Sequence, residues 1–186
     1  AAASKVLQAL VDAIDNKNAL EKATAQLLMA SHFEVVSRGQ TSKPADTQAV
    51  DEAYLTAAKM SDHSAVRLDI GEYFKNNRRW PEAEKWYREA IVRAQAEKSP
   101  DAEKTARQNL IDVIVRSKDP ARENDIKKEI DEFSQKYNDP YAFVAECDYH
   151  VNAGRLDQAL IAINRFVDRR PDSANGHFKR GTIYFL

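Results

Sequence analysis

Prolines divide the middle of this chain into segments of helical periodicity, and this division constrains the fold more than any other feature. Proline stands where a helix can begin, mostly after a residue that caps helices well, in the pairs Trp80-Pro81, Ser99-Pro100, Asp119-Pro120 and Asp139-Pro140. Between them, apolar residues recur at steps of three and four, as in Ala83, Tyr87, Ala90, Ile91 and Ala94. Helices joined by such short turns pack antiparallel on their neighbours, so we expect helix hairpins.

Composition supports an all-α fold. The 186 residues include only 5 glycines and 6 prolines, and 31% of the residues are charged, as amphipathic helices with short turns require. The length is sufficient for one domain or two small ones. We expect a continuous core built from the apolar faces of the helices.

The hairpins show signs of repetition. The segment Ile70-Gly71-x2-Phe74 is followed by Ala83-x3-Tyr87-x2-Ala90. This resembles the tetratricopeptide pattern, which has Leu-Gly-x2-Tyr on a first helix and Ala-x3-Phe on a second. The resemblance implies a right-handed superhelical stack of antiparallel helix hairpins, in which small residues let two helices approach and aromatic residues fill the space between hairpins.

A second hairpin begins near Pro140, with Ala159-x3-Ile163 on its second helix and Cys147 and His150 in the places of the glycine and the tyrosine. The family's repeat length is 34 residues, and a step of 34 leads from Cys147 to Gly181 and from His150 to Tyr184. We therefore expect a half-repeat at the end of the chain. This half-repeat has no capping residue after it, which favours a fragment of a longer protein.

The remaining segments are predicted from periodicity alone. In the middle segment, Ile126-x3-Ile130-x2-Phe133 runs three residues late against a 34-residue frame, so we expect a divergent repeat with a longer turn. Upstream, Val50-x3-Tyr54-x2-Ala57 resembles a second helix, and residues 20–36 supply an apolar-periodic first helix. A short helix over residues 4–14 precedes it, and Asn18 and Glu21 resemble a capping box. We assign residues 1–47 to N-terminal helices and residues 48–186 to tetratricopeptide-like repeats.

The sequence carries no pattern typical of catalysis, so we expect no enzyme activity, cofactor or metal. Of the four histidines, His150 alone stands close to Cys147, and this pair supplies too few ligands for a metal site. The five glycines stand singly and form no phosphate-binding loop. The single cysteine is best interpreted as a small buried apolar residue in a glycine position.

Charge and hydropathy exclude two further classes of partner. The 28 basic and 29 acidic residues leave a net charge of −1, which does not favour nucleic acid or an anionic membrane. No apolar run is long enough to cross a bilayer, and the first five residues show no signal-peptide pattern, so we expect a soluble chain with no assigned compartment.

The resemblance implies a concave groove lined by the first helices, and in it positions nine and thirteen of each repeat. Counted from Ser64, Lys104, Pro140 and Ala174, position nine is Glu72, Asp112, Asp148 and Thr182, and position thirteen is Asn76, Arg116 and Asn152. Three acids in register favour a ligand with basic or hydrogen-bond-donating groups. The groove also lacks the Lys and Asn clamp by which chaperone-binding members of the family hold a carboxylate. The competing interpretation is that the acids solvate this face or pair with neighbouring bases.

The resemblance therefore implies a non-catalytic scaffold that binds a protein or peptide. One alternative is a regulatory or recruitment module of a larger protein that contains an enzyme. Another is self-association as a homo-oligomer through the final half-repeat, with Phe178, Ile183, Tyr184, Phe185 and Leu186 seeking a cover.

Overall fold

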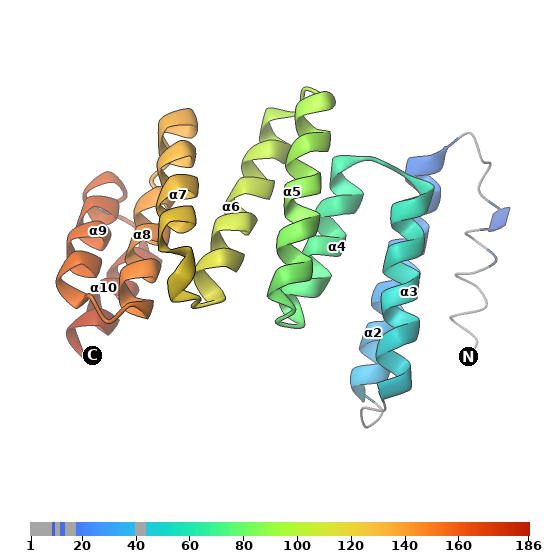
Figure 1. Cartoon of the computed structure of the whole chain (residues 1–186), viewed down its shortest axis with the longest axis horizontal. Helices are drawn as coiled ribbons and strands as arrows, with labels where there is room; N and C mark the ends of the chain where they lie inside the picture. Colours follow the sequence, from blue (N-terminus) through green and yellow to red (C-terminus); the bar gives the residue numbers. More distant parts are fainter. Residues whose placement is uncertain (1–8, 10–11, 14–17, 40–43) are drawn as a thin grey trace. The chain divides into compact units, whose positions relative to one another are not determined.

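The computed structural model of the chain describes residues 9, 12–13, 18–39 and 44–186. Within these residues it contains nine α-helices, one short 3-10 helix and no strand (Figure 1). The prediction of an all-α fold is confirmed. The chain forms two compact units, Ala1–Glu103 and Lys104–Leu186. None of the helices in the described ranges is both long and apolar enough to cross a membrane.

The first unit contains two pairs of neighbouring helices. Helix α2 (Ala19–Gly39) packs against α3 (Pro44–Met60), and α4 (Ser64–Asn76) packs against α5 (Trp80–Ala96). The second pair joins the first through contacts of α4 with both α2 and α3. Helix α6 (Pro100–Arg116) begins in this unit.

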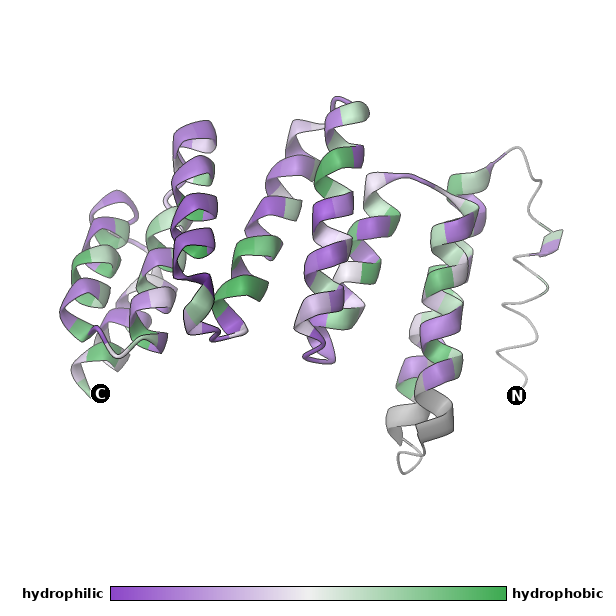
Figure 2. Cartoon of the chain, in the orientation of Figure 1, coloured by the Kyte–Doolittle hydropathy of each residue, from purple (hydrophilic) through white to green (hydrophobic). Residues whose placement is uncertain are grey.

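The second unit contains the remainder of α6 and the elements that follow it. These are the 3-10 helix η1 (Pro120–Arg122), α7 (Glu123–Tyr137), α8 (Tyr141–Asn152), α9 (Leu156–Arg169) and α10 (Ala174–Tyr184). Helix α8 packs mainly against α9, and it also contacts α7, while α10 packs against α9. Along these helices hydrophobic residues alternate with hydrophilic ones at helical spacing, as Figure 2 shows.

The predicted helix starts match the structure to within a few residues. Proline occupies the first turn of α5, starts α6 and η1, and is the N-cap of α8. The Asp119 carboxylate accepts a hydrogen bond from Ala121 N at 2.9 Å, and Ser173 Oγ accepts one from Gly176 N at 3.2 Å. The predicted cap at Asn18 is also present, because Asn18 Oδ1 accepts from Glu21 N at 3.3 Å. The helix predicted over residues 4–14 lies outside the described residues except at 9, 12 and 13.

The predicted apolar faces form the core. Within the described residues, fully or nearly buried side chains include Val50, Tyr54, Ala57, Ala83, Tyr87, Ala90, Ile91, Ala94, Leu110, Ile111, Ile114, Ile126, Ile130, Phe133, Ala159 and Ile163. Trp86 belongs to the edge of this core and is buried beside Tyr87. The periodic pattern therefore identified the inward faces of α3, α5, α6, α7 and α9.

The turns after α4, α5, α6 and α7 share a backbone geometry that the sequence pattern did not reveal. Each contains one non-glycine residue with a positive φ, at intervals of twenty residues: Arg78 (57°), Lys98 (56°), Lys118 (52°) and Asn138 (47°). After α4, Arg79 N donates to Phe74 O at 2.9 Å and Arg78 N to Lys75 O at 3.0 Å, and the corresponding bonds follow α5. This is the Schellman arrangement, which satisfies carbonyls at the end of a helix.

The twenty-residue interval explains why the middle segment departs from a 34-residue frame. Helices α5 and α6 each span 17 residues, and a three-residue turn follows each of them. A hairpin made of two such helices and their turns is longer than the family's repeat of 34 residues. Its second helix therefore begins later than a 34-residue frame predicts. The expected longer turn is present: residues 117–122 connect α6 to α7, and the last three of them form η1, which continues directly into α7.

Close approach of two helices in the first unit depends on Gly71. A Cβ placed on Gly71 would lie 2.7 Å from Cε1 and 2.8 Å from Cδ1 of the Tyr87 ring. The Tyr87 ring is fully buried, and its hydroxyl donates to the Glu72 carboxylate at 3.0 Å, so the ring has little freedom to move away. The corresponding hairpin of the second unit places Cys147 in one buried cluster with Ala159, Ala162 and Ile163.

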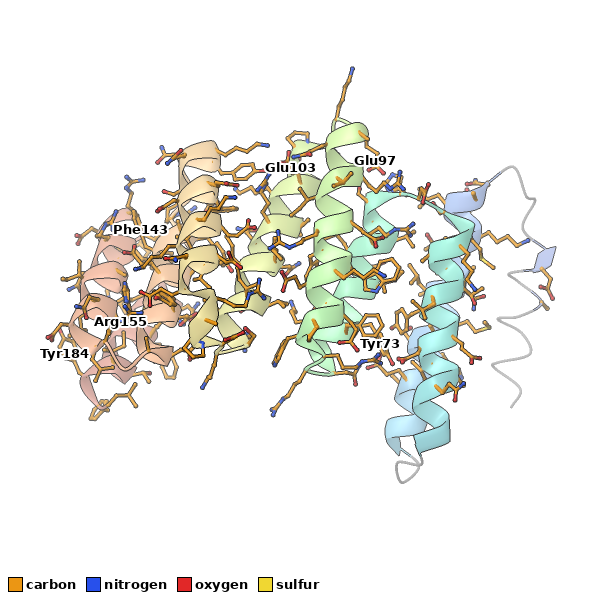
Figure 3. The ribbon with its side chains drawn as sticks, in the orientation of Figure 1. Tyr73, Glu97, Glu103, Phe143, Arg155 and Tyr184 are labelled. Atoms are coloured by element: carbon orange, nitrogen blue, oxygen red, sulfur yellow. The ribbon has the colours of Figure 1, made fainter. Side chains whose placement is uncertain are left out.

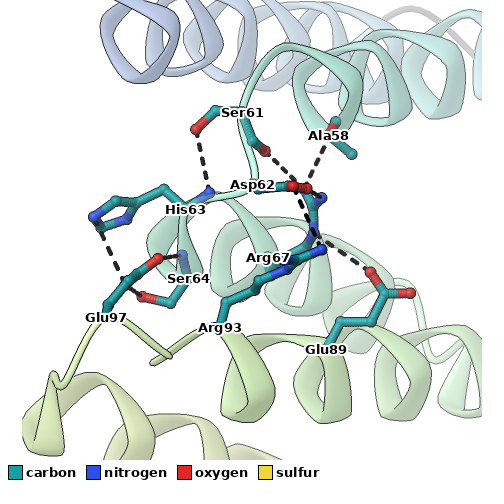
Figure 4. Close-up of polar contacts among 9 residues, drawn as sticks. All are labelled: Ala58, Ser61, Asp62, His63, Ser64, Arg67, Glu89, Arg93 and Glu97. Carbon is teal, nitrogen blue, oxygen red and sulfur yellow. Dashed lines mark hydrogen bonds and ion pairs between the residues drawn. The ribbon is translucent and has the colours of Figure 1, made fainter. Parts of the chain in front are cut away.

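A buried arginine fixes the turn between α3 and α4. Arg67 is 5% exposed, and its Nη1 donates to the carbonyl oxygens of Ala58 (3.2 Å) and Ser61 (3.0 Å). Its Nη2 donates to Asp62 at 2.8 Å, and its Nε lies 3.4 Å from a Glu89 carboxylate oxygen (Figure 4). The Arg67 guanidinium thus donates hydrogen bonds to carbonyl oxygens at the end of α3 and pairs with an acidic residue of α5.

A second set of polar contacts lies at the same end of the α4–α5 hairpin, where α4 begins and α5 ends. Glu97, which follows α5, accepts hydrogen bonds from both the backbone N of Ser64, at 2.7 Å, and the Ser64 hydroxyl (Figure 4). His63 Nε2 lies 3.7 Å from the same carboxylate, while its Nδ1 accepts from Ala65 N and caps α4. The start of α4 is therefore held to the end of α5 by charge-assisted hydrogen bonds.

We predict that Arg67→Met destabilises the first unit by about 2 to 4 kcal/mol, because two backbone carbonyls lose their donor and the acids lose their partner. Urea unfolding followed by tryptophan fluorescence measures this, since Trp80 and Trp86 both lie in this unit. Arg88→Met is the matched control, because Arg88 forms an exposed pair with Glu84 within one helix, and it should cost less than about 1 kcal/mol. Equal losses of stability in the two variants would contradict the role of Arg67 in fixing the turn between α3 and α4.

We also predict that Gly71→Ala destabilises the chain by about 1 to 3 kcal/mol, because the added methyl group meets the Tyr87 ring. This loss should appear although alanine favours helix by up to about 1 kcal/mol. Gly181→Ala is the control, since a Cβ at Gly181 meets no atom within 4 Å and the variant should be neutral or more stable. Urea unfolding followed by circular dichroism compares the two. Higher stability of both variants would show that the α4–α5 contact has room for a methyl group.

Candidate functional site

The second unit brings together four of the six residues predicted to line a groove. Asp112 and Arg116, one turn apart on α6, form an ion pair of 2.7 Å. The hydrogen bond to Asp112 raises the pKa of Arg116, and the charge of Asp148 on α8 also raises it. Asn152 of α8 donates to the carbonyl oxygen of Val115 at 3.0 Å. A hydrogen bond and the charge of Asp148 thus connect these residues of α6 and α8, and their place in a groove stays a prediction.

The other two predicted residues lie in the first unit. Glu72 pairs with Lys75 at 2.6 Å and accepts from the Tyr87 hydroxyl, and Asn76 is exposed at the end of α4. A ladder that runs through both units therefore stays a prediction, whereas the part formed by α6 and α8 can be described atom by atom.

Each predicted acid has a basic partner. Glu72 is paired with Lys75, Asp112 with Arg116, and Asp148 with Lys179 of α10. The first two pairs lie within one helix and are visible as spacings of three and four residues. The third joins two helices and has no signal in the sequence. The face is therefore a surface of alternating charge and not a run of uncompensated acids.

Tyr141 connects these charges to the interior. Its hydroxyl donates to the carbonyl oxygen of Gln108 at 3.0 Å, which ties α8 to α6. Burial, together with the charges of Asp112 and Asp148, raises the pKa of Tyr141, so the hydroxyl stays protonated and acts as a donor. Tyr141 and Lys179 are the residues of this site that the sequence did not indicate. We name the set formed by Asp112, Arg116, Tyr141, Asp148, Asn152 and Lys179 the mixed-charge face.

A small cleft of about 110 Å³ lies beside this face. Val115, Pro120, Ile126 and Ala153 supply its apolar lining, and Glu123, Asn152 and Arg155 are among its polar residues. Arg155, at the N-cap of α9 and labelled in Figure 3, donates to Glu123 at 3.0 Å and also to the Tyr149 hydroxyl. The Lys127 ammonium, the Tyr149 hydroxyl and the Arg155 guanidinium lower the pKa of Glu123 to about 2.

Cys147 and His150, the neighbouring cysteine and histidine of the sequence, both carry uncharged side chains near neutral pH. Burial raises the pKa of the Cys147 thiol to about 11, so the thiol stays protonated near neutral pH. Burial, and next the charge of Arg155, lowers the pKa of His150, which therefore stays neutral there. His150 lines a second cleft of about 280 Å³ with Phe143, Glu146 and Arg165. Within the described residues, no group of three or more His, Cys, Asp or Glu side chains is placed to hold a metal ion.

A wider depression of about 730 Å³ lies where the end of α9 meets the starts of α8 and α10. Its walls include Tyr141, Val144, Phe166 and the guanidinium groups of Arg169 and Arg170. Arg169 donates to the Asn138 side chain at 3.2 Å, and Asp139 pairs with Lys104 at 2.6 Å. These contacts tie the turn before α8 to the end of α9 and to α6.

We predict that ¹³C NMR titration gives Glu123 a pKa of about 2 and that Arg155→Met raises it toward the ordinary value of a glutamate. Because the folded pKa is depressed, the stabilisation that Glu123 provides is present above its unfolded pKa and is lost as the pH falls toward 2. Arg165→Met, which removes a cation from the other cleft, should leave this pKa unchanged. An ordinary pKa for Glu123 in the unmodified chain would contradict the network.

Comparison of the chain with protein-family models, with curated protein sequences and with solved structures finds no match. The resemblance to tetratricopeptide repeats therefore rests on the motifs around Gly71, Cys147 and Gly181 and on the paired helices.

Proposed function

We propose that the chain is a non-catalytic interaction scaffold, built as a tetratricopeptide-like right-handed stack of hairpins, that holds a peptide or partner protein on the surface of its first helices. The motif at Gly71, its counterpart at Cys147 and the antiparallel pairs α4–α5 and α8–α9 support this architecture. In such a stack α6, α8 and α10 are successive first helices, and they present one continuous face to a ligand.

The observation that carries the proposal is that this face of the second unit is polar, organised and accessible. Ion pairs and hydrogen bonds join side chains from α6, α8 and α10 across the mixed-charge face. The side chains of Asp112 and Asp148 keep 26% and 39% of their surface exposed, so both carboxylates can meet a ligand. Core residues lie directly beneath, since Val113, Cys147 and Tyr149 are buried.

The energetics of exposed ion pairs determine which ligand fits. A pair such as Asp112 with Arg116 is worth only about 0 to 1 kcal/mol, because water and salt screen it. A basic group of a ligand can therefore replace Arg116 or Lys179 at little cost in free energy. The ligand then gains a contact with a carboxylate that Tyr141 and Asn152 help to position through their bonds to α6. We infer a ligand that carries basic or hydrogen-bond-donating groups.

The test measures binding of peptides selected from an unbiased displayed library against the purified chain. We predict that the selected peptides are enriched in Lys and Arg, and that the double substitution Asp112→Asn with Asp148→Asn weakens their binding by about 10- to 30-fold. This corresponds to roughly 1 kcal/mol for each lost contact. Raising the ionic strength should weaken binding to the unmodified chain and have less effect on the double variant.

Asp168→Asn is the control, because Asp168 is an exposed acid on the second helix α9 and its loss changes the charge in the same direction, by one unit where the double variant changes it by two. It should leave the affinity within twofold of the unmodified chain. Selection of acidic or uncharged peptides, or equal losses in the control and the double variant, would exclude a basic ligand on this face.

A further inference from the structure

The cleft of about 110 Å³ beside the mixed-charge face has an apolar floor. Val115 of α6 and Ile126 of α7 are buried side chains that line it, and Pro120 of η1 and Ala153, the C-cap of α8, line it as well. These four side chains offer water over the floor no hydrogen-bonding partner. Displacement of such water by an apolar group is favourable. The floor therefore suits an apolar side chain of a ligand.

The charged groups that line the cleft compensate one another. They comprise two basic and two acidic side chains, those of Lys118, Arg155, Asp119 and Glu123. Glu123 accepts a hydrogen bond from Arg155 at 3.0 Å, and the Asp119 carboxylate caps η1. A charged group of a ligand would lose its water here without meeting a surplus of the opposite charge. The rim therefore favours an uncharged side chain.

The volume of the cleft limits the size of that side chain. A cavity of about 150 Å³ in a protein core holds one benzene molecule, and this cleft is smaller. A branched aliphatic side chain can enter it, whereas the ring of phenylalanine is too large to enter fully. The cleft thus suits valine, leucine or isoleucine.

The cleft is continuous with the mixed-charge face through Asn152, which belongs to both. Near the start of α8, Tyr141 donates to the carbonyl oxygen of Gln108. At the end of α8, Asn152 donates to that of Val115, seven residues further along α6. The two helices therefore run parallel and end beside the cleft. A ligand that lies along them over the mixed-charge face reaches the cleft at their ends.

The spacing between the acids and the cleft fits an extended peptide. On α8, Asp148 stands four residues before Asn152, a rise of about 6 Å along the helix axis. On α6, Asp112 stands three residues before Val115, a rise of about 4.5 Å. In an extended peptide, alternate side chains point the same way and lie roughly 6.6 Å apart. A basic side chain at either carboxylate thus places the side chain two positions away over the cleft.

We propose that the cleft binds a branched aliphatic side chain of the same peptide whose basic group meets the mixed-charge face. The ligand then carries valine, leucine or isoleucine two positions from a lysine or arginine. This inference rests on the proposed function and specifies its ligand further. The cleft lies between internal elements of the chain, since α6, η1, α7, α8 and the N-cap of α9 form it, and α10, which follows them, lines no part of it.

The probe is a synthetic peptide of the sequence Gly-Ser-Arg-Ser-Leu-Ser-Arg-Ser-Gly. An arginine stands two positions from the leucine on each side, so the spacing holds for either direction of the peptide along the helices. NMR titration of the ¹⁵N-labelled whole chain should show saturable binding with a Kd below about 1 mM. Replacing the leucine by alanine should weaken binding about 5- to 10-fold, because the cleft then stays wet. Replacing it by phenylalanine should weaken binding as well, because the ring does not fit.

Ala153→Leu is the variant of the chain that tests the site. Ala153 is exposed, so the variant should fold with a Tm close to that of the unmodified chain, and its added side chain occupies the mouth of the cleft. It should bind the leucine peptide about as weakly as the alanine peptide, and it should bind the alanine peptide within twofold of the unmodified chain. Ala174→Leu is the matched control, because Ala174 is an exposed alanine of α10 that does not line the cleft. It should keep the full preference for leucine.

Two results would overturn this inference and leave the proposed function in place. One is equal affinity of the leucine and alanine peptides while Asp112→Asn with Asp148→Asn weakens both, because the mixed-charge face would then bind without the cleft. The other is a preference for leucine that Ala153→Leu and Ala174→Leu leave equally intact. Affinity for the leucine peptide that does not change in the Asp112→Asn, Asp148→Asn variant would instead contradict the proposed function, and with it the spacing on which this inference rests.

Discussion

The contact of a small residue on one helix with a large residue on the next sets the distance between the helices of these hairpins. In the α4–α5 hairpin the Tyr87 ring lies so close to Gly71 that a single methyl group has no room. The polar contacts at the open end of this hairpin require that distance. Arg67 reaches Glu89, and Ser64 reaches Glu97, where the start of α4 lies beside the second half of α5. The apolar contact thus sets the distance between the two helices. The charged contacts then select one register among the registers that this distance permits.

Charged side chains then connect one hairpin to its neighbours inside each unit. In the first unit, Tyr73 of α4 stacks on Tyr54 of α3, with ring centroids 4.0 Å apart, and donates to Asp51 at 2.6 Å. Asp51 is also held by Arg79, which lies in the turn after α4. In the second unit, Asp148 and Lys179 have the corresponding role between α8 and α10. The ion pairs among these contacts individually add little free energy, but they fix which face of each helix remains exposed.

Much of the fold could be predicted from the sequence because apolar periodicity and helix caps are local signals. Ile126, Ile130 and Phe133 of α7 could be identified as core residues from their spacing alone, and the structure buries them. The pair Asp112–Arg116 could be expected for the same reason, since four residues separate its members. The partner of Asp148 could not be predicted, because Lys179 comes from another helix. The distance between these two side chains depends on how α8 and α10 pack. Tyr141 gave no signal either, since its role depends on the carbonyl of Gln108, which sequence patterns do not describe.

The positive φ angles at Arg78, Lys98, Lys118 and Asn138 also have a consequence for how this chain can change in length. A helix and its turn occupy the same twenty positions from one of these residues to the next, and the turn closes on its own backbone bonds. An insertion or deletion of a few residues within such a helix would rotate every later side chain about the helix axis, by about 100° per residue, and carry the apolar stripe into water. Loss or duplication of a whole twenty-residue segment would keep the stripe facing inward and would reverse the direction of the following helices. Removing or adding two such segments restores that direction as well, so between residues 79 and 138 a complete hairpin of forty residues is the step in length that the fold accommodates.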